Sequence, residues 1–210
     1  MPAFSTPSFL DALLPGAGAA TDAETSTEGI WDDRLAALAA GGDSESFRAL
    51  VCRHENALHG FCFHLLGCSE DARDAAQEIF VRTWHALPHY VPRRQFRAWL
   101  WRIALNLCCD RLRSRKRRSP VVPWSVHFDE SLIAPGLDPG EAAQWRSEWE
   151  KLSRALCGMP ESLRWPLTLC AIEGLSQAEC ASVLNLSIRS VEGRIHRARA
   201  WLHEWWSRHS

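Results

Sequence analysis

The residues best suited to chemistry in this sequence are basic and aromatic side chains interleaved between positions 93 and 118. This stretch reads RRQFRAWLWRIALNLCCDRLRSRKRR and holds ten Arg or Lys residues against one acidic residue. Guanidinium groups neutralise phosphates, and aromatic rings beside a basic groove stack on unpaired bases. The stretch therefore predicts contact with melted nucleic acid. The alternative is a solvated Arg run over a Trp-containing core. Trp99 and Trp101 lie two positions apart, so they face different sides of a helix and one of them is expected to be buried.

A second basic stretch lies near the C-terminus and reads LSQAECASVLNLSIRSVEGRIHRARAWL. Ser176 and Glu179 have the spacing of a capping box, in which each side chain satisfies a free backbone amide of the other residue. A short turn over residues 185–187 leads to a second helix with an apolar stripe and a separate Arg face. This layout predicts a helix-turn-helix whose second helix enters the major groove. The alternative is an ordinary solvated helix hairpin.

A polar ridge is predicted in the segment SEDARDAAQEIFVRTW. Asp74, Gln77 and Glu78 fall at positions i, i+3 and i+4, which share one side of a helix. Such a ridge is either a protein-binding surface or a solvent-facing one.

Five potential metal ligands cluster in the sequence, namely His54, His59, Cys62, His64 and Cys68. His59 and Cys62 could share a helical face as zinc ligands, whereas His64 points elsewhere and Cys is a common core residue. The adjacent Cys108 and Cys109 cannot both face one ion. We expect no metal site and no other cofactor.

Composition predicts an all-α protein of two small helical domains joined by a flexible linker. The chain has 46% hydrophobic residues and eleven Trp, and few segments alternate as strands do. We predict a disordered acidic tail over 1–29, a helical domain over 30–118, a linker over 119–140 and a helix-turn-helix domain over 141–210. Within these, Asp43 and Ser69 are candidate helix caps, and one helix is expected over 161–173.

Charge is segregated along the chain although the net charge is only −1. Residues 1–46 hold eight acidic and one basic residue, and residues 119–150 hold six acidic and one basic residue. No basic residue precedes Arg34, and no apolar run approaches the roughly 18 residues of a membrane span. These features predict a cytoplasmic protein whose eight Cys are mostly reduced.

Three segments, in this order, resemble the extracytoplasmic-function (ECF) sigma factors, a group within the sigma-seventy type of bacterial RNA polymerase subunits. They read DARDAAQEIFVRTWHAL, FRAWLWRIALNLCCDRLRSRKRR and MPESLRWPLTLCAIEGLSQAECASVLNLSIRSVEGRIHRARAWL. The likeness spans about residues 44–202. It implies RNA polymerase core and promoter DNA as partners, an anti-sigma factor as a further candidate partner, no membrane insertion, and no enzymatic activity of the chain itself.

The resemblance also implies three sets of site residues. The core polymerase set is Asp71, Asp74, Gln77, Glu78 and Phe80. The set for the minus-ten-type element, which lies around the 90–95 loop and the helix after it, is Arg93, Arg94, Trp99, Arg102, Asn106, Arg111 and Arg113. The set for the minus-thirty-five-type element is Arg189, Glu192, Gly193, Arg194, His196 and Arg197.

Rival functions explain less of the chain. A stand-alone helix-turn-helix repressor accounts for the C-terminal half and leaves residues 69–118 unexplained. A Cys/His metal sensor predicts stoichiometric zinc in the purified protein. A nuclease predicts magnesium-dependent DNA cleavage, yet the acidic residues are poorly placed for a phosphate-facing metal.

Overall fold

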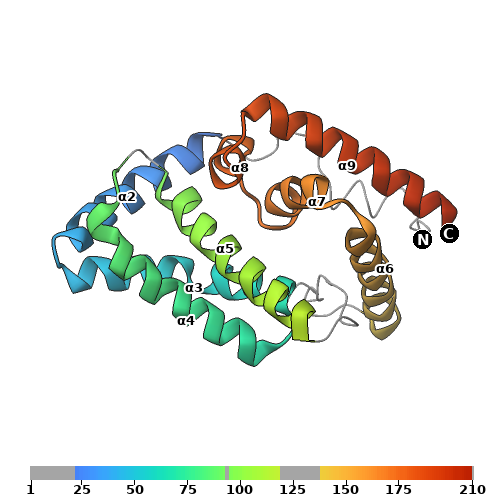
Figure 1. Cartoon of the computed structure of the whole chain (residues 1–210), viewed down its shortest axis with the longest axis horizontal. Helices are drawn as coiled ribbons and strands as arrows, with labels where there is room; N and C mark the ends of the chain where they lie inside the picture. The colour runs from blue at the N-terminus through green and yellow to red at the C-terminus, as the bar shows by residue number, and fades with distance from the viewer. Residues whose placement is uncertain (1–21, 93–94, 119–137, 210) are drawn as a thin grey trace. The chain divides into compact units, whose positions relative to one another are not determined.

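Helices make up all the regular structure in the part of the chain that the computed structural model describes, residues 22–92, 95–118 and 138–209 (Figure 1). The all-α prediction is therefore confirmed. In chain order the elements are α2 (Asp22–Ala40), α3 (Ser44–Leu66), α4 (Ser69–Ala86), η1 (Leu87–His89), α5 (Phe96–Arg118), α6 (Pro139–Gly158), α7 (Glu161–Leu167), η3 (Thr168–Ile172), α8 (Gln177–Leu184) and α9 (Ile188–Arg208).

Contacts divide the chain into two compact units, as predicted. One unit spans Ser26–Gly158 and the other contains Met159–Ser210. Helix α6 is grouped with the first unit, whereas the predicted second domain began at residue 141. The boundary at 141 therefore stays a prediction, and the predicted linker lies outside the described residues up to position 137.

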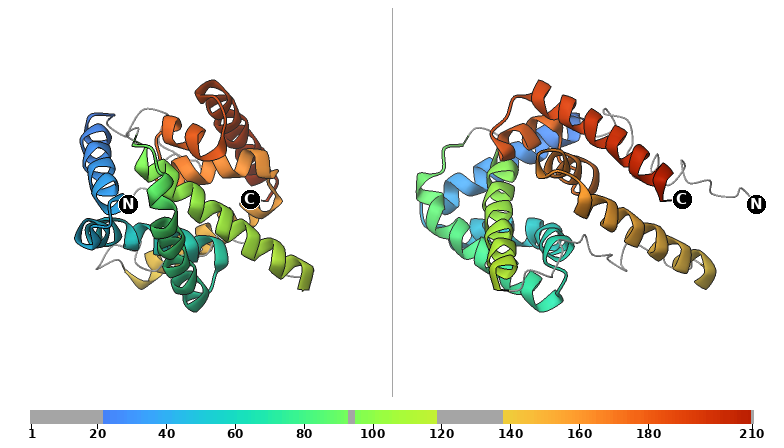
Figure 2. Two further views of the ribbon diagram at one scale, coloured as in Figure 1. Left: turned by 60° about the vertical axis from the view of Figure 1, so that its left-hand side comes forward. Right: turned by 45° about the vertical axis from the view of Figure 1, so that its right-hand side comes forward.

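In the first unit, α3, α4 and α5 pack side by side (Figures 1 and 2). Asp43 caps α3 by accepting a hydrogen bond from the Glu45 amide at 3.2 Å, and Gly67 ends this helix with a φ of 72°, a conformation that glycine adopts without a steric penalty. The largest fully buried side chains that the three helices share are Trp101, Phe61, Phe96, Leu50, Leu58, Leu65, Ile79 and Leu100. Each removes apolar surface from water, which contributes about 1.5–3 kcal/mol per side chain.

Two expectations for this unit were wrong in detail. Helix α2 begins at Asp22, so residues 22–29 are helical rather than part of a disordered tail, and the earlier tail residues lie outside the described ranges. Extending a helix already held by packing costs far less free energy than nucleating a new one.

Ser69 is the first residue of α4 and not its cap, because the chain is still extended at Cys68 after the turn at Gly67.

In the second unit, the single helix expected over 161–173 is divided. Pro166 has no amide hydrogen, so it cannot donate to the carbonyl of Ser162 inside α7. The helix widens directly afterwards into the π-type turn η3, where the Glu173 amide donates to the Thr168 carbonyl at 3.1 Å. Helices α8 and α9 follow as the predicted pair.

None of the helices within the described ranges is long and apolar enough to span a membrane.

Candidate functional site

Helix α4 carries the predicted polar ridge on the side opposite its packing face. Its buried residues are Ala72, Ala75, Ala76, Ile79 and Thr83. Asp74 and Gln77 of the predicted ridge are exposed and Glu78 is partly buried, as are Asp71 and Phe80 of the predicted polymerase-binding set. The ridge therefore divides into a solvent-facing pair and Glu78, which contacts α5.

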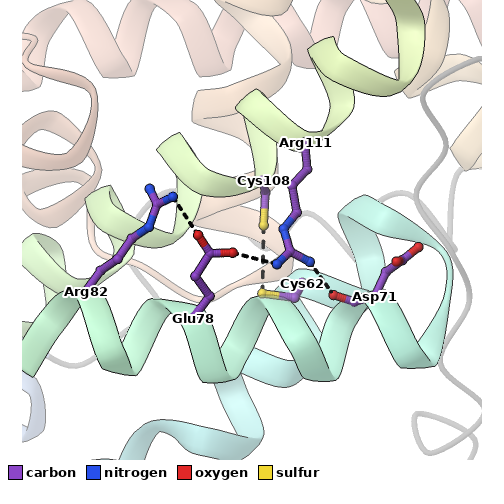
Figure 3. A network of polar contacts seen from close by, with 6 residues as sticks. All are labelled: Cys62, Asp71, Glu78, Arg82, Cys108 and Arg111. Atoms are coloured by element: carbon purple, nitrogen blue, oxygen red, sulfur yellow. Dashed lines mark hydrogen bonds and ion pairs between the residues drawn. The ribbon is translucent and has the colours of Figure 1, made fainter. Parts of the chain in front are cut away.

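A network of ion pairs ties the ridge to α5 (Figure 3). Glu78 accepts from Arg82 of its own helix and from Arg111 of α5, each at 2.6 Å. The second Arg111 nitrogen donates to the backbone carbonyl of Asp71 at 3.1 Å. Hydrogen bonding from Arg111 is the main cause that lowers the pKa of Glu78. Burial opposes it with a smaller effect, and Arg82 adds to the lowering.

Arg115 adds a second tie between the same two helices. It pairs with the Asp71 carboxylate and donates to the Leu66 carbonyl at 2.7 Å. Arg115 was not among the predicted site residues, although its spacing of four from Arg111 places both on one side of α5. Residues predicted for two different partners, Asp71 and Glu78 on one hand and Arg111 on the other, are thus joined within the protein.

The remaining described members of the minus-ten-type set share another side of α5. At about 100° per residue, Trp99, Arg102, Asn106 and Arg113 fall within an arc of roughly 60°, and Arg111 lies roughly 120° or more away. Arg102, Asn106 and Arg113 are exposed and Trp99 is partly exposed. Arg93 and Arg94 lie outside the described residues. Helical periodicity alone could have separated Arg111 from this face.

The tryptophan pair divides as expected, since Trp101 is 1% exposed in the core. Trp99 instead joins an aromatic cluster at the start of α5. Its ring centroid lies 4.8 Å from that of Tyr90 and 5.8 Å from that of Phe96, and the Tyr90 and Phe96 centroids are 5.7 Å apart. The cluster offers a partly exposed indole beside basic residues, which suits stacking on an unpaired base.

A buried carboxylate from α2 supports this cluster. The Tyr90 hydroxyl donates to Asp33 Oδ1 at 2.6 Å, and the Phe96 amide donates to the same oxygen at 3.1 Å. Asp33 was not among the predicted site residues, because no local pattern in α2 reveals a partner 57 positions away.

His54 and Cys62 of the His/Cys cluster lie in the core, whereas Cys68 is exposed. His54 pairs with Asp32 at 2.9 Å, and the sulfurs of Cys62 and Cys108 lie 3.8 Å apart in the core. Within the described ranges, no three His, Cys, Asp or Glu side chains are grouped so that they could hold a metal ion.

In the second unit, α8 and α9 have the predicted helix-turn-helix geometry. The Ser176–Glu179 capping box is present, with the Glu179 amide donating to Ser176 Oγ at 3.2 Å. Asn185 makes the turn with a φ of 54°, and Ser187 caps α9 by accepting from the Ser190 amide at 3.2 Å. The turn therefore depends on residue types that favour it, an Asn in the left-handed conformation and a Ser that caps the next helix.

Helix α9 keeps its apolar stripe inside, with Val191, Ile195, Ala198, Leu202 and Trp206 buried. Of the predicted DNA-binding set on this helix, Arg194 is partly exposed and Arg189, Glu192, Gly193, His196 and Arg197 are exposed. No ion pair involves Arg189, Arg194 or Arg197 within the described part of the chain. The outer face of α9 thus presents guanidinium groups to solvent.

Comparison with known proteins matches two segments of the chain to two parts of one family. Residues 50–118 match Sigma-70 region 2, and residues 149–202 match Sigma-70, region 4. The RNA polymerase sigma factor CnrH of Cupriavidus metallidurans is 40% identical over 177 residues, which cover 81% of this chain and 92% of CnrH. The ECF RNA polymerase sigma factor SigW of Bacillus subtilis is 30% identical over 164 residues, which cover 75% of this chain and 87% of SigW. The chain belongs to the ECF sigma factors of the sigma-70 family.

Solved sigma factor structures share the fold. CnrH in complex with the cytosolic domain of CnrY matches with a TM-score of 0.60 at 36% identity and covers 86% of this chain and 99% of CnrH. The sigma factor RpoE from Bartonella quintana, solved with the anti-sigma factor NepR, matches with a TM-score of 0.59 at 22% identity and covers 78% of this chain and 98% of RpoE. The match to RpoE supports the fold alone.

Family membership fixes the general function. The chain is a sigma factor that directs RNA polymerase to promoters, and it is a regulatory subunit rather than an enzyme. The repressor alternative is not favoured, because region 2 accounts for the residues that it left unexplained. Asp33 lies before the residues matched to region 2, so the family match does not assign it a role.

Proposed function

We propose that this sigma factor uses three helical faces to bind RNA polymerase core and two promoter elements. The exposed ridge residues Asp74 and Gln77 of α4, with Phe80 beside them, bind RNA polymerase core. The α5 face bearing Trp99, Arg102, Asn106 and Arg113 binds the minus-ten-type element, assisted by Arg93 and Arg94. The outer face of α9 binds the minus-thirty-five-type element.

The observation that carries this proposal is the difference between the two basic faces. The α5 face combines cations with an aromatic cluster, which suits unpaired bases. The α9 face carries cations and hydrogen-bonding side chains on the second helix of a helix-turn-helix, which suits the edges of paired bases in the major groove. A protein that captures melted DNA at one element and reads duplex DNA at another needs these two kinds of surface.

Asp71, Glu78 and Arg111 have a supporting part in this scheme. Their mutual contacts fix α4 against α5, so they fix the position of the polymerase-binding ridge relative to the face that binds melted DNA. Each of these side chains still has partly exposed surface, so a partner can contact the network from outside.

The test is transcription in vitro by core polymerase from the same source, with and without this protein, on a library of upstream regions from its genome. New transcription starts that depend on the protein and share two spaced elements would support the proposal. DNA binding without polymerase-dependent initiation would overturn it and favour a repressor.

An anti-sigma partner is the second part of the proposal. CnrH was solved with the cytosolic domain of CnrY, and the present chain exposes apolar residues beside the ridge. Val81 is 56% exposed and Trp84 is 37% exposed on α4. A protein covering these residues would block polymerase and would meet the sigma factor in the cytoplasm. Addition of the purified cytosolic domain of CnrY should reduce transcription by the wild type and less so by Trp84→Ala, whereas equal or absent inhibition would contradict this interface.

A further inference from the structure

Asp33 lies where α2 meets both ends of the 90–95 loop. One carboxylate oxygen accepts from the Tyr90 hydroxyl at 2.6 Å and from the Phe96 amide at 3.1 Å. Tyr90 is the first residue of the loop and Phe96 is the first residue of α5. A single atom from a distant helix therefore fixes the two points between which the loop runs.

The position of this carboxylate also suits the start of a helix. The first amides of α5 have no partner within the helix, and the positive end of the helix dipole favours a negative charge there. Asp33 is 7% exposed, so water competes little for these hydrogen bonds. Hydrogen bonds to a charged, shielded acceptor are stronger than those between neutral groups.

The two groups held by Asp33 are the neighbours of Trp99 in the aromatic cluster. The Tyr90 ring lies 4.8 Å from Trp99 and the Phe96 ring lies 5.8 Å from it. Trp99 in turn is one helical turn after the Phe96 amide that Asp33 binds. Displacement of either held group would change how the indole is presented.

We infer that Asp33 is a positioning residue for promoter opening, which holds Tyr90 and the first turn of α5 so that Trp99 is pre-organised to stack on an unpaired base. Because the cluster is already ordered when the protein folds, the entropic cost of ordering it does not reduce the affinity for DNA. This inference rests on the proposed function of the α5 face and adds to it a residue of α2 that does not touch DNA.

The decisive comparison is between Asp33→Ala and Asp43→Ala in the full chain assembled with core polymerase. Asp43 is also an Asp that caps a helix of the same unit, through the Glu45 amide and the Ser46 hydroxyl, and it has no contact with the cluster. Both variants lose a cap, but the Asp33 cap is buried and the Asp43 cap is exposed, so unchanged affinity for core polymerase is the check that each variant is folded. Only Asp33→Ala should alter the cluster.

Two quantities separate positioning from folding, namely the affinity for core polymerase and the rate of promoter opening. Opening is followed by the fluorescence of 2-aminopurine placed in the minus-ten-type element of a promoter found by the transcription assay. Asp33→Ala should slow opening roughly tenfold, the loss expected for a hydrogen bond to a charged group, with core affinity unchanged. Asp43→Ala should change neither quantity by more than about twofold. Equal opening rates in the two variants would overturn the inference.

Tyr90→Phe provides a milder test that does not depend on the folding of Asp33→Ala. It keeps the ring in the cluster and removes only the hydroxyl, so opening should slow by roughly threefold to fivefold. A Tyr90→Phe protein that opens promoters at the wild-type rate would contradict the role of the Asp33–Tyr90 contact. If the wild type itself supports no initiation, the proposed function fails instead, and that result is distinct from normal opening by the Asp33 and Tyr90 variants.

Discussion

Helix α5 holds eight Arg or Lys residues and α9 holds five Arg residues, and the two helices also differ in the partners of these residues. In α5, Arg111 and Arg115 are bound to acidic residues of α4, and Arg113 pairs with Asp110 at 3.2 Å on the surface. In α9, Arg197 donates to the Gly193 carbonyl at 3.1 Å, and its charge is not neutralised by a described carboxylate. A guanidinium group that is paired with a carboxylate of the protein is less available to bind a phosphate. Pairing therefore matters more than the number of basic residues.

Replacement of an Arg residue by Ala is therefore expected to have different effects in the two helices. Removal of Arg194 or Arg197 from α9 should weaken DNA binding and leave folding intact. Removal of Arg111 from α5 should lower the stability of the fold first, because Glu78 would keep only Arg82 of its own helix and the ion pair that joins α4 to α5 through Glu78 would be lost.

The largest effect is expected for Arg194→Ala combined with Arg197→Ala. Each Arg that contacts a base edge or a phosphate contributes roughly 1–3 kcal/mol, so promoter affinity should fall at least tenfold. Binding measured over a series of salt concentrations should also give a shallower slope. Arg208→Ala is the matched control, because Arg208 is on the same helix and already pairs with Glu204. Equal losses in the control and the double variant would contradict the assignment of the α9 face.

Arg111→Ala should lower the free energy of unfolding in urea by about 1 kcal/mol, a value kept low because water screens its partly exposed pair with Glu78. Arg113→Ala, whose pair is 70% and 68% exposed, should lower it by less than about 0.5 kcal/mol. If Arg113→Ala proves the more destabilising of the two, the distinction between the two sides of α5 is wrong.

Gly193→Ala tests whether the exposed face of α9 is shaped for a close approach. A Cβ at Gly193 would meet nothing within 4 Å, so the protein itself does not require glycine there. Alanine should stabilise the helix by about 0.5–1 kcal/mol, as measured by thermal unfolding. Promoter affinity should fall in the same variant if DNA lies against this position. Unchanged affinity would remove Gly193 from the DNA-binding set.

The smallest effect concerns the pH dependence of the Glu78 pair. Because Arg111 lowers the pKa of Glu78 in the folded protein, the ion pair adds stability above the ordinary glutamate pKa, and this contribution is lost as pH falls through the lowered value. Urea unfolding of the wild type and Glu78→Gln should therefore differ near pH 7 and converge in acid. A difference that persists at the lowest pH would show that the charge of Glu78 is not its source.

Much of this protein was predictable from local signals. The cap at Asp43, the Ser176–Glu179 capping box and the buried stripe of α9 depend on residues within a few positions of one another, and each was identified from spacing. The start of α2 was less predictable because helix ends depend on propagation from packed residues. Pro166 signalled a disturbance, although its outcome as a π-type turn depends on how the next residues pack.

The helices, the helix-turn-helix and the two basic stretches depend on residue type and short-range periodicity, so they could be predicted from the sequence alone. Helix packing is what binds Arg111 and Arg115 to α4, buries Trp101 while Trp99 stays partly exposed, and brings Asp33 to Tyr90. These outcomes depend on contacts between residues about 30 to 60 positions apart. Such contacts form only when helix packing brings distant segments together, and no periodicity within one helix encodes them.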